Sequence, residues 1–523
     1  MDTVHPPTTF PHPAGAEHLR ADVAVVGAGV IGLATAWELR RRGCSVVVVD
    51  PDPGAGASRA AAGMLAPVSE VRHQQDALVP LMRASAAAYP GFVAGLEAAA
   101  GASVGHRATE TLVCAADPAD RQALADLREL QLRHGMEVEA LPVRAARALE
   151  PALSPRLAGA FRIPGDHQVD PRRLVAALLA ALTAPAPPEG APAGPVRIVH
   201  DRVTTLRRGP SGAVTGVRLS RGGMVSAGGT LLAPGAALAA IDGLPAGARP
   251  PLRPVHGDIL RARLPDGAPE LLGRTVRGLV HGVPVYLVPR ADRTLVIGAT
   301  SREDDLAGAN AGGVFRLLRD AQALVPGTAD LELTEVLARA RPGTPDDVPC
   351  LGPVRDPDGT PVPGLVLSTG YFRHGVLLTP LAARLAVQLL AGEPGPDPAA
   401  DAQLLATTDP QRFATPSPTP RSPDDRPPPQ RPPARDRGRA DRRRPRRRGR
   451  RPPPRARRRP AGRRAPRGRR GPRRRGRAPQ PVGDHHGGRG PVRRDRHRRA
   501  GRLSPCTPPP TRSSSTACAC PPG

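Results

Sequence analysis

The chain has few of the features that mark a secreted, membrane-spanning or zinc-binding protein. Only six of its 523 residues are cysteine, and Cys44, Cys114 and Cys350 stand far apart, in neither a disulfide framework nor a zinc-ligand spacing. Residues 1–20 are polar and rich in proline, without the apolar core of a signal peptide. The longest notable apolar stretch, residues 174–182, is too short to cross a membrane. We therefore expect a reduced, cytoplasmic protein with a flexible leader at 1–20, no membrane span and no metal site.

Lysine is absent, so all 75 basic residues are arginine. They are unevenly spread, because residues 411–523 contain 36 Arg and 6 Asp, a net charge of +30. The rest of the chain has 75 − 36 = 39 Arg against 47 − 6 = 41 acidic residues, a net charge of −2. The sequence pI of about 11.5 is therefore a property of the C-terminal tail.

The tail, residues 414–523, is arginine, proline and glycine with almost nothing to bury, so it is predicted to be disordered. Its charge could bind nucleic acid or an anionic membrane, but only non-specifically, because no aromatic residue for base stacking follows Phe413. A composition of Arg, Pro, Gly and Ala without Lys or Glu is typical of GC-rich DNA read in a wrong frame. A frameshifted or read-through terminus is the preferred interpretation, and a genuine basic segment is the alternative.

The strongest pattern is a strand, a glycine-rich turn, a helix and a second strand in residues 22–50. Gly27 makes the tight turn, Gly29 lets the backbone approach a pyrophosphate, and Gly32 lets the helix pack closely on the strand. The helix N-terminus offers N–H groups and the positive end of its dipole to that pyrophosphate. Asp50 ends the second strand, where an acid can hold the ribose hydroxyls. These features together predict a dinucleotide-binding unit.

The next segment, residues 54–67, distinguishes FAD from NAD. It reads Gly-Ala-Gly-Ala-Ser-Arg-Ala-Ala-Ala-Gly-Met-Leu-Ala-Pro, a run of mostly small side chains. Small side chains let the backbone lie close against a large, flat, buried ligand. At a nicotinamide site, by contrast, the chain would usually continue directly into the next helix. This segment favours FAD.

From about residue 22 to residue 413 the sequence resembles the FAD-dependent D-amino-acid oxidase family and, within it, the glycine oxidases of thiamin biosynthesis. The segments that carry the resemblance are GAGVIGLATAWEL, ASRAAAGML, VYLVPR, RPGTPDDVPCLGP and TGYFRHGVLLTP. The resemblance implies an α/β fold, in which a Rossmann-like FAD domain of the glutathione-reductase type is interleaved with an α+β substrate domain on an antiparallel sheet. It places the FAD domain at about 21–75, 170–250 and 340–413, and the substrate domain at about 76–169 and 251–339.

The resemblance also implies an activity. The family member would oxidise glycine, or a small amine such as sarcosine or a small D-amino acid, to the 2-oxo acid, ammonia and hydrogen peroxide, with oxygen as the acceptor. The imine or glyoxylate would supply thiazole formation in thiamin biosynthesis, and a homo-oligomer is expected. Two alternatives stay open: a D-amino-acid oxidase or dehydrogenase of other specificity, and a basic nucleic-acid-associated protein whose flavin domain is secondary.

A small amino-acid substrate needs at least one charged anchor for its carboxylate. Arg341 is the candidate, because a planar guanidinium can bind a carboxylate through two parallel N–H···O bonds and because it matches the family's carboxylate-binding arginine. The resemblance implies that Tyr286 also binds the carboxylate. It further implies that Arg373 offers its backbone carbonyl to the amine while its side chain lines the site. His374 and Pro284 replace the asparagine and histidine that are usual in the family.

The resemblance assigns the cofactor contacts as well, with Met64 as an apolar cover over the flavin and the backbone of Val203 against the adenine. The predicted cofactor-binding residues are Gly27, Gly29, Val30, Ile31, Gly32, Asp50, Ser58, Ala62, Gly63, Met64, Val203, Gly370, His374, Gly375, Val376 and Leu377. Sarcosine-type oxidases resemble one another in using a lysine to activate oxygen, which this chain lacks. Cys350 lies in the wrong motif position for a covalent flavin link.

Four predictions of local structure bear on the site. Apolar spacing predicts a helix from about residue 76 to 100, broken at Pro90, and a last helix from Val376 to Leu390. Asp170 followed by Pro171 is a strong helix start. A strand is expected from Leu331 to Arg339, with Arg341 just beyond it.

Truncation after Phe413 should leave the enzyme intact, because the residues beyond it contain no core-forming pattern and no family motif. The shortened chain should keep the flavin content, melting temperature and turnover of the full chain. It should also lose any retention on heparin, since the positive charge is in the tail. Loss of folding or activity on truncation would show that the tail belongs to the enzyme.

Overall fold

The computed structural model describes residues 18–185 and 193–414. The leader expected at 1–20 therefore lies almost wholly outside the described residues, and the tail expected at 414–523 lies outside them beyond Ala414. Among the helices of the described ranges, none combines the length and the apolar character that a membrane crossing requires.

The first of two eight-stranded sheets is centred on a parallel group around the N-terminal strand. Its strands are β1 (His18–Val26), β2 (Val46–Val49), β8 (Val196–Val199), β9 (Val203–Arg208), β10 (Val214–Leu219), β11 (Met224–Leu232), β17 (Cys350–Arg355) and β18 (Pro361–Thr369). The order across the sheet is β17-β18-β11-β1-β2-β8, and β10 and β9 continue from β11 as antiparallel strands. Strand β1 pairs in parallel with β2 and β11.

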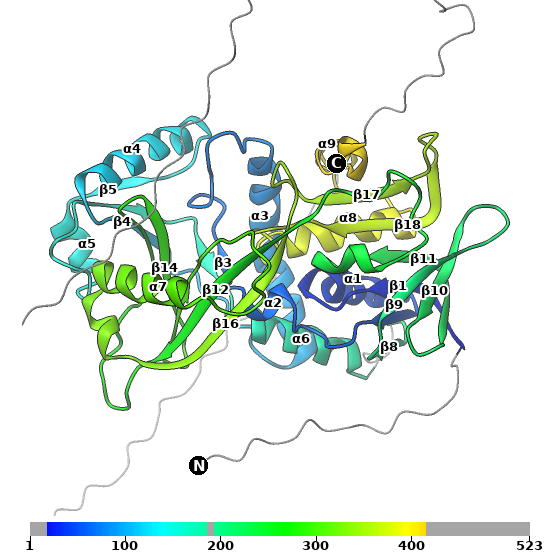
Figure 1. Ribbon diagram of the computed structural model, residues 1–523, viewed down its shortest axis with the longest axis horizontal. Helices are drawn as coiled ribbons and strands as arrows, with labels where there is room; N and C mark the ends of the chain where they lie inside the picture. The colour runs from blue at the N-terminus through cyan, green and yellow to red at the C-terminus, as the bar shows by residue number, and fades with distance from the viewer. Residues whose placement is uncertain (1–17, 186–192, 415–523) are drawn as a thin grey trace, which may run out of the picture. The chain divides into compact units, whose positions relative to one another are not determined.

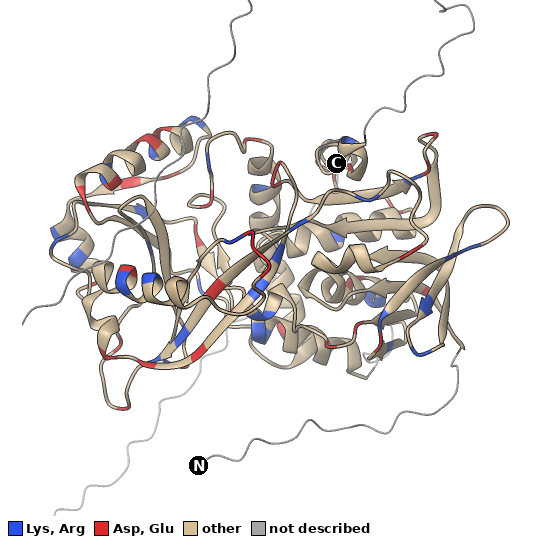
Figure 2. Cartoon of the chain, in the orientation of Figure 1, with Lys and Arg blue, Asp and Glu red and all other residues tan. Residues whose placement is uncertain are grey.

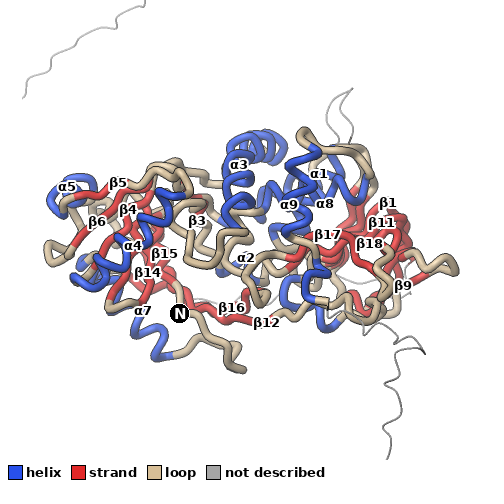
Figure 3. The backbone as a smooth tube through the Cα atoms, turned by 90° about the horizontal axis from the view of Figure 1, so that it is seen from above, coloured by secondary structure: helices blue, strands red, loops and turns tan. Residues whose placement is uncertain are grey.

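Four helices pack together beside this sheet: α1 (Val30–Arg41), α3 (Leu78–Ala100), α6 (Pro171–Thr183) and α8 (Thr379–Ala391). The predicted first helix is thus confirmed as α1, which is buried over ten of its twelve residues. Asp170 caps α6 by accepting hydrogen bonds from the backbone N–H groups of Arg172 and Arg173, as its sequence predicts. Figure 3 shows α1, α3 and α8 lying together between the strands of the two sheets.

The second sheet is antiparallel except for one parallel pair. Its strands are β4 (Thr111–Ala115), β5 (Glu139–Leu141), β6 (Gly159–Ile163), β12 (Arg253–Arg263), β13 (Thr275–Val280), β14 (Val283–Pro289), β15 (Thr294–Gly298) and β16 (Glu332–Gly343), in the order β16-β12-β15-β14-β13-β4-β6-β5. Only β13 and β4 run parallel among these pairs. Helix α7 (Ala311–Leu324) packs against β12 to β15, and α4 (Pro118–Arg133) and α5 (Val143–Leu149) lie beside β4, β6 and β5. The two sheets confirm the predicted α/β class with an antiparallel second sheet.

The long pair β12 and β16 runs from the second sheet toward the helices of the first (Figure 1). Arg341 lies inside β16, paired with Val255 of β12, so the prediction that the strand ends before it was wrong. The reason is that the β12 pairing continues through Gly343, and Pro342 is tolerated because β16 is an edge strand. Arg341 therefore projects from a paired strand.

Short elements complete the described part of the chain. They are α2 (Ala57–Ala60), β3 (Met64–Leu65), β7 (His167–Gln168), η1 (Gly235–Ala240), η2 (Pro326–Asp330), α9 (Pro398–Thr407) and η3 (Pro410–Phe413). Strands β3 and β7 form a small antiparallel sheet of their own.

Two predicted helix boundaries were wrong. Helix α3 continues through Pro90, which lies on its exposed side, while Leu81, Tyr89 and Leu96 on the opposite side are fully buried and hold the helix together. Helix α8 begins at Thr379 rather than Val376, because the preceding residues form hydrogen-bonded turns.

Arginine and acidic residues nearly balance in the chain before residue 411. Figure 2 shows arginine and acidic segments interspersed on the helices and on the long strands. The excess positive charge of the chain therefore resides in the part beyond Ala414.

Replacing Gly32 by Ala should destabilise the protein by about 3 kcal/mol or more, because the added methyl group would overlap the backbone carbonyl of Gly27 and push α1 off β1. Gly91→Ala is the matched control, since Gly91 lies in α3 with open space around it. That change should stabilise the protein by up to about 1 kcal/mol. Urea unfolding of both variants measures the difference. Equal stability of the two would contradict the packing argument.

Candidate active site

One cavity of about 560 Å³ lies where the turn after β1, the small-residue segment and the face of the second sheet come together. Most of the residues predicted to contact cofactor or substrate line it. They are Gly29, Val30, Ile31, Asp50, Ser58, Ala62, Gly63, Met64, Tyr286, Arg341, Arg373, His374, Gly375, Val376 and Leu377. Gly27, Gly32, Val203 and Gly370 are not among the lining residues.

The turn after β1 forms one end of the cavity. Gly27 has a φ of 102°, and a side chain there would overlap the carbonyl of Ala233. Helix α1 begins at Val30, and because Gly29 has no side chain to cap it, the Val30 N–H donates to the Ser58 hydroxyl (3.1 Å). The Asp50 carboxylate accepts the N–H groups of Ala28 (2.7 Å) and Asp52 (2.8 Å). This end therefore presents a helix N-terminus, a bare glycine backbone and one carboxylate, which fit a pyrophosphate and a ribose.

The small-residue segment forms one wall, and its backbone is held in place by a buried arginine. Arg290 donates to the carbonyls of Ala62 and Val169 and to the Gln168 side chain. A side chain on Gly63, which has a φ of 72°, would overlap the Val169 carbonyl. Burial lowers the pKa of Arg290 to about 10. The wall is thus a fixed stretch of backbone of the kind that can lie against a flat ligand.

The turn between β18 and α8 forms the opposite wall. Gly370 has a φ of 77°, and Phe372, with a φ of 43°, donates its N–H to the carbonyl of Pro342 at the end of β16. His374 is buried, and burial followed by the charge of Arg373 lowers its pKa to about 3, so its side chain is neutral at physiological pH. The turn is therefore tied to the strand that carries Arg341.

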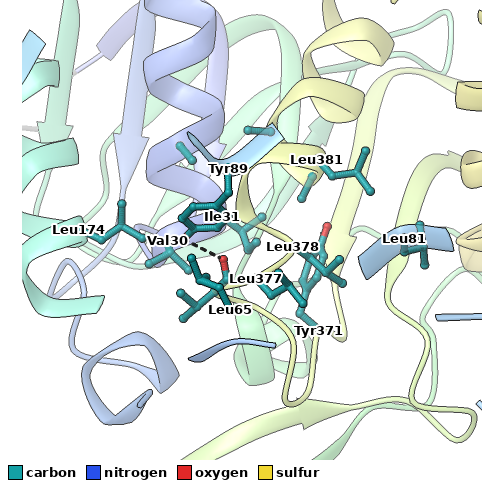
Figure 4. Close-up of a cluster of buried hydrophobic side chains, with 14 of the residues drawn as sticks. Val30, Ile31, Leu65, Leu81, Tyr89, Leu174, Tyr371, Leu377, Leu378 and Leu381 are labelled. Carbon is teal, nitrogen blue, oxygen red and sulfur yellow. Dashed lines mark hydrogen bonds between the residues drawn. The ribbon is translucent and has the colours of Figure 1, made fainter. Parts of the chain in front are cut away.

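Helix α3 supports this wall from behind. Tyr89 donates to the carbonyl of Val376 (3.2 Å), and Ser85 donates to the carbonyl of Leu377 (2.7 Å). Figure 4 shows Tyr89 in one apolar cluster with Ile31 and Leu377. These contacts fix the backbone of the turn on the side away from the cavity.

The substrate anchors predicted from the sequence come together on one face of the second sheet. The Arg341 guanidinium donates to the carbonyl of Thr300 (3.2 Å) and lies beside the Tyr286 phenol. Burial raises the pKa of Tyr286, although the neighbouring Arg341 opposes the shift, so the phenol is a neutral hydrogen-bond donor. A guanidinium and a phenol side by side at a cavity wall have the donors that a carboxylate would need.

A second charged group in the cavity was missed by the sequence analysis. The Glu70 carboxylate lies 2.5 Å from Arg277 and 3.7 Å from Arg373, and all three side chains are nearly buried. Burial alone would raise the pKa of Glu70, but Arg277 and Arg373 reverse the shift and hold the pKa below its usual value. The three side chains, which we call the Glu70 cluster, carry a net positive charge next to Tyr286, which lies directly opposite Arg277.

One signal in the sequence could have located part of this cluster. His281 and Gly282 both have positive φ and form a two-residue hairpin turn between β13 and β14. That turn places Arg277 directly opposite Tyr286, so the hairpin spacing predicts the pair. Glu70 lies in an irregular segment, and no pattern marks it.

Comparison with known proteins gives consistent matches. Residues 22–389 match the family model described as FAD dependent oxidoreductase. The chain is 32% identical over 379 residues to the bifunctional protein ThiO/ThiG of Nostoc sp., which covers 71% of this chain and 52% of that protein. It is 31% identical over 392 residues to the putative thiamine biosynthesis oxidoreductase ThiO of Rhizobium etli, covering 72% and 98% of the two chains. The chain thus spans about half the length of the ThiO/ThiG relative.

Among solved structures, the chain is similar to the glycine oxidase of Geobacillus kaustophilus. The sequences are 31% identical, the TM-score is 0.63, and the match covers 72% of this chain and 96% of that one.

The Glu70 cluster generates a stability prediction. Glu70→Gln should destabilise the protein by about 3 kcal/mol, because it leaves two nearly buried arginines without their counter-charge. The folded pKa of Glu70 is below that of the unfolded chain. The advantage of the wild type should therefore be complete above about pH 4.3 and shrink as the pH falls below it.

Urea unfolding of wild type and variant between pH 3 and pH 8 measures the effect. Glu393→Gln is the control, because the exposed Glu393 makes only a 3.5 Å ion pair with Arg42 and should matter by less than about 0.5 kcal/mol. A Glu70→Gln variant as stable as this control would show that the cluster is not a structural ion pair.

Proposed function

The chain belongs to the family of FAD-dependent oxidoreductases, and from that premise we propose that it oxidises glycine or another small amino acid, such as sarcosine or a small D-amino acid. Its cofactor is FAD. The proposed reaction converts glycine, oxygen and water into glyoxylate, ammonia and hydrogen peroxide. The observation that carries the proposal is the pairing of Arg341 with Tyr286 at the cavity wall, where a small carboxylate would bind.

Glycines line the cavity at the positions where FAD would lie against the backbone. Gly29 and the α1 N-terminus would hold the pyrophosphate, and Asp50 would hold the ribose. The backbone at Gly63 and the turn at Gly375 would lie on either side of the ring system. FAD, once bound, supplies the acceptor for the hydride that leaves the substrate carbon.

The protein's own residues would bind and orient the substrate. Arg341 and Tyr286 would hold the carboxylate, the backbone carbonyl of Arg373 would accept a hydrogen bond from the amine, and Met64 would cover the ring with an apolar surface. The positive charge of the Glu70 cluster disfavours an ammonium group in the same space. It therefore favours the neutral amine, which is the form that can lose a hydride.

We propose that FAD is held without a covalent bond, because none of the described free cysteines, Cys44, Cys114 and Cys350, lines the cavity. Oxygen is the proposed electron acceptor, in keeping with the name glycine oxidase of the Geobacillus protein. A role in supplying thiazole formation is proposed from the name of the Rhizobium relative. The homo-oligomer and the binding of nucleic acid by the tail stay predictions.

Replacing Arg341 by Ala should lower kcat/KM for glycine about tenfold to a few hundredfold, since a charge-assisted pair contributes about 1.5–3 kcal/mol or more once desolvated. The loss should lie mainly in KM, because the carboxylate is bound equally in ground and transition states. Arg341→Lys should recover only part of the activity, because a point charge cannot form the two-pronged pair. Peroxide production from glycine, sarcosine and D-amino acids measures both the activity and the effect.

Amines without a carboxylate serve as the internal control, since they should be nearly indifferent to the loss of Arg341. Wild-type kcat/KM on glycine in Arg341→Ala, with FAD fully bound, would show that the anchor lies elsewhere, with Arg373 as the next candidate. Absence of peroxide from every amino acid tested would overturn the proposed activity itself and favour a dehydrogenase.

A further inference from the structure

Each of the two proposed carboxylate-binding side chains lies across a glycine of the strand beside it. The Arg341 guanidinium lies directly over Gly257, where an added methyl group would overlap both terminal nitrogens and the carbon between them. The Tyr286 ring lies over Gly298 in the same way, and a methyl group there would come within 2.6 Å of the ring carbon that bears the hydroxyl. Neither glycine has a positive φ.

The register of the sheet places the two glycines on the same face as Tyr286 and Arg341. Gly298 pairs with Tyr286 of β14 on one side and with Ile259 of β12 on the other. Gly257 lies two residues before Ile259 and pairs with Arg339, which lies two residues before Arg341. Since paired residues and residues two apart share a face, both glycines, Tyr286 and Arg341 lie on the same face of the sheet. This face lines the cavity.

The position of the Arg341 guanidinium over Gly257 is also fixed by its hydrogen bond to a buried polar unit, which consists of Thr300, Asp258 and Arg302. Its acceptor is the Thr300 carbonyl, and Thr300 is bound to Asp258 through its hydroxyl (2.7 Å) and its backbone N–H (3.2 Å). The Asp258 carboxylate is fully buried and is paired with Arg302 at 3.0 Å. Because breaking such a buried unit is costly, the acceptor cannot move to follow a displaced guanidinium.

We propose that Gly257 and Gly298 are positioning residues for the substrate carboxylate: they let the Arg341 guanidinium and the Tyr286 phenol lie flat on the sheet, side by side, with their donors facing the same point in the cavity. The inference rests on the proposed role of Arg341 as the carboxylate anchor. It requires that no side chain projects from the sheet beneath the Arg341 guanidinium. A side chain at Gly257 raises the guanidinium out of reach of the Thr300 carbonyl and out of line with the phenol.

Gly257→Ala tests the inference with little risk to folding, because the atoms that it displaces are the end of one long side chain and not backbone atoms. We expect kcat/KM for glycine to fall about tenfold to a hundredfold, which is the scale of a misplacement of about 1 Å. The loss should lie in KM, and the dissociation constant of acetate, read from the flavin absorbance, should rise by a similar factor. FAD content and melting temperature should stay at the wild-type level.

The decisive comparison is the same substitution made in the Arg341→Ala background. There the methyl group has no guanidinium to displace, so Gly257→Ala should change kcat/KM by less than about twofold. Gly308→Ala is the matched control: it lies on the loop after Arg302 and has open space around it, and it should leave every measured quantity unchanged.

Several outcomes would overturn the inference. An equal loss in both backgrounds, or a collapse of the melting temperature, would show that Gly257 serves packing and not the anchor. Wild-type KM and acetate affinity in Gly257→Ala, while Arg341→Ala alone is impaired, would show that the anchor does not need the bare surface. Wild-type kinetics in Arg341→Ala itself would instead remove the proposed anchor, so failure of the proposed function is distinguishable from failure of this inference.

Discussion

The close approach of α1 to β1 is the constraint on which the rest of the structure depends. Gly32 packs against the carbonyl of Gly27, and a single methyl group at either glycine would overlap backbone atoms. With this contact in place, the N-terminus of α1 lines the cavity, and Asp50, at the end of the neighbouring strand, lies beside the turn. Helices α6 and α8 pack against α1, and α3 packs against α6 and α8, behind the turn that lines the cavity.

The buried carboxylates of Glu70 and Asp258 are both paired with arginine, since the chain has no lysine. Glu70 is paired with Arg277 and lies near Arg373, and Asp258 is paired with Arg302. Buried ion pairs of this kind add little net stability, but they resist rearrangement, because removing one partner leaves an uncompensated charge. They suit a site whose function depends on holding two donors at fixed positions.

The sequence predicted the parts of the site that belong to local motifs. The dinucleotide turn, Asp50 and the cap at Asp170 follow from patterns within a few tens of residues, where backbone sterics and side-chain periodicity decide. The α/β class was implied by the resemblance to a known family. The predictions failed where packing overrides a local rule. Helix α3 passes through Pro90 because its buried side holds it together, and β16 extends through Arg341 because β12 pairs with it.

The sequence by itself therefore determined the glycine-rich turn with its flanking strands and the helix start at Asp170, and its resemblance to a family named Arg341 as the candidate carboxylate anchor. The tertiary structure alone decided what surrounds that anchor. Glu70 and Arg277 are 207 residues apart, and Gly257 meets the guanidinium of Arg341 only across a strand pair. No local pattern encodes such contacts, because they arise from the register of paired strands and from the packing of segments that are distant in sequence. Only the folded structure shows which glycines and which carboxylates contact the candidate site.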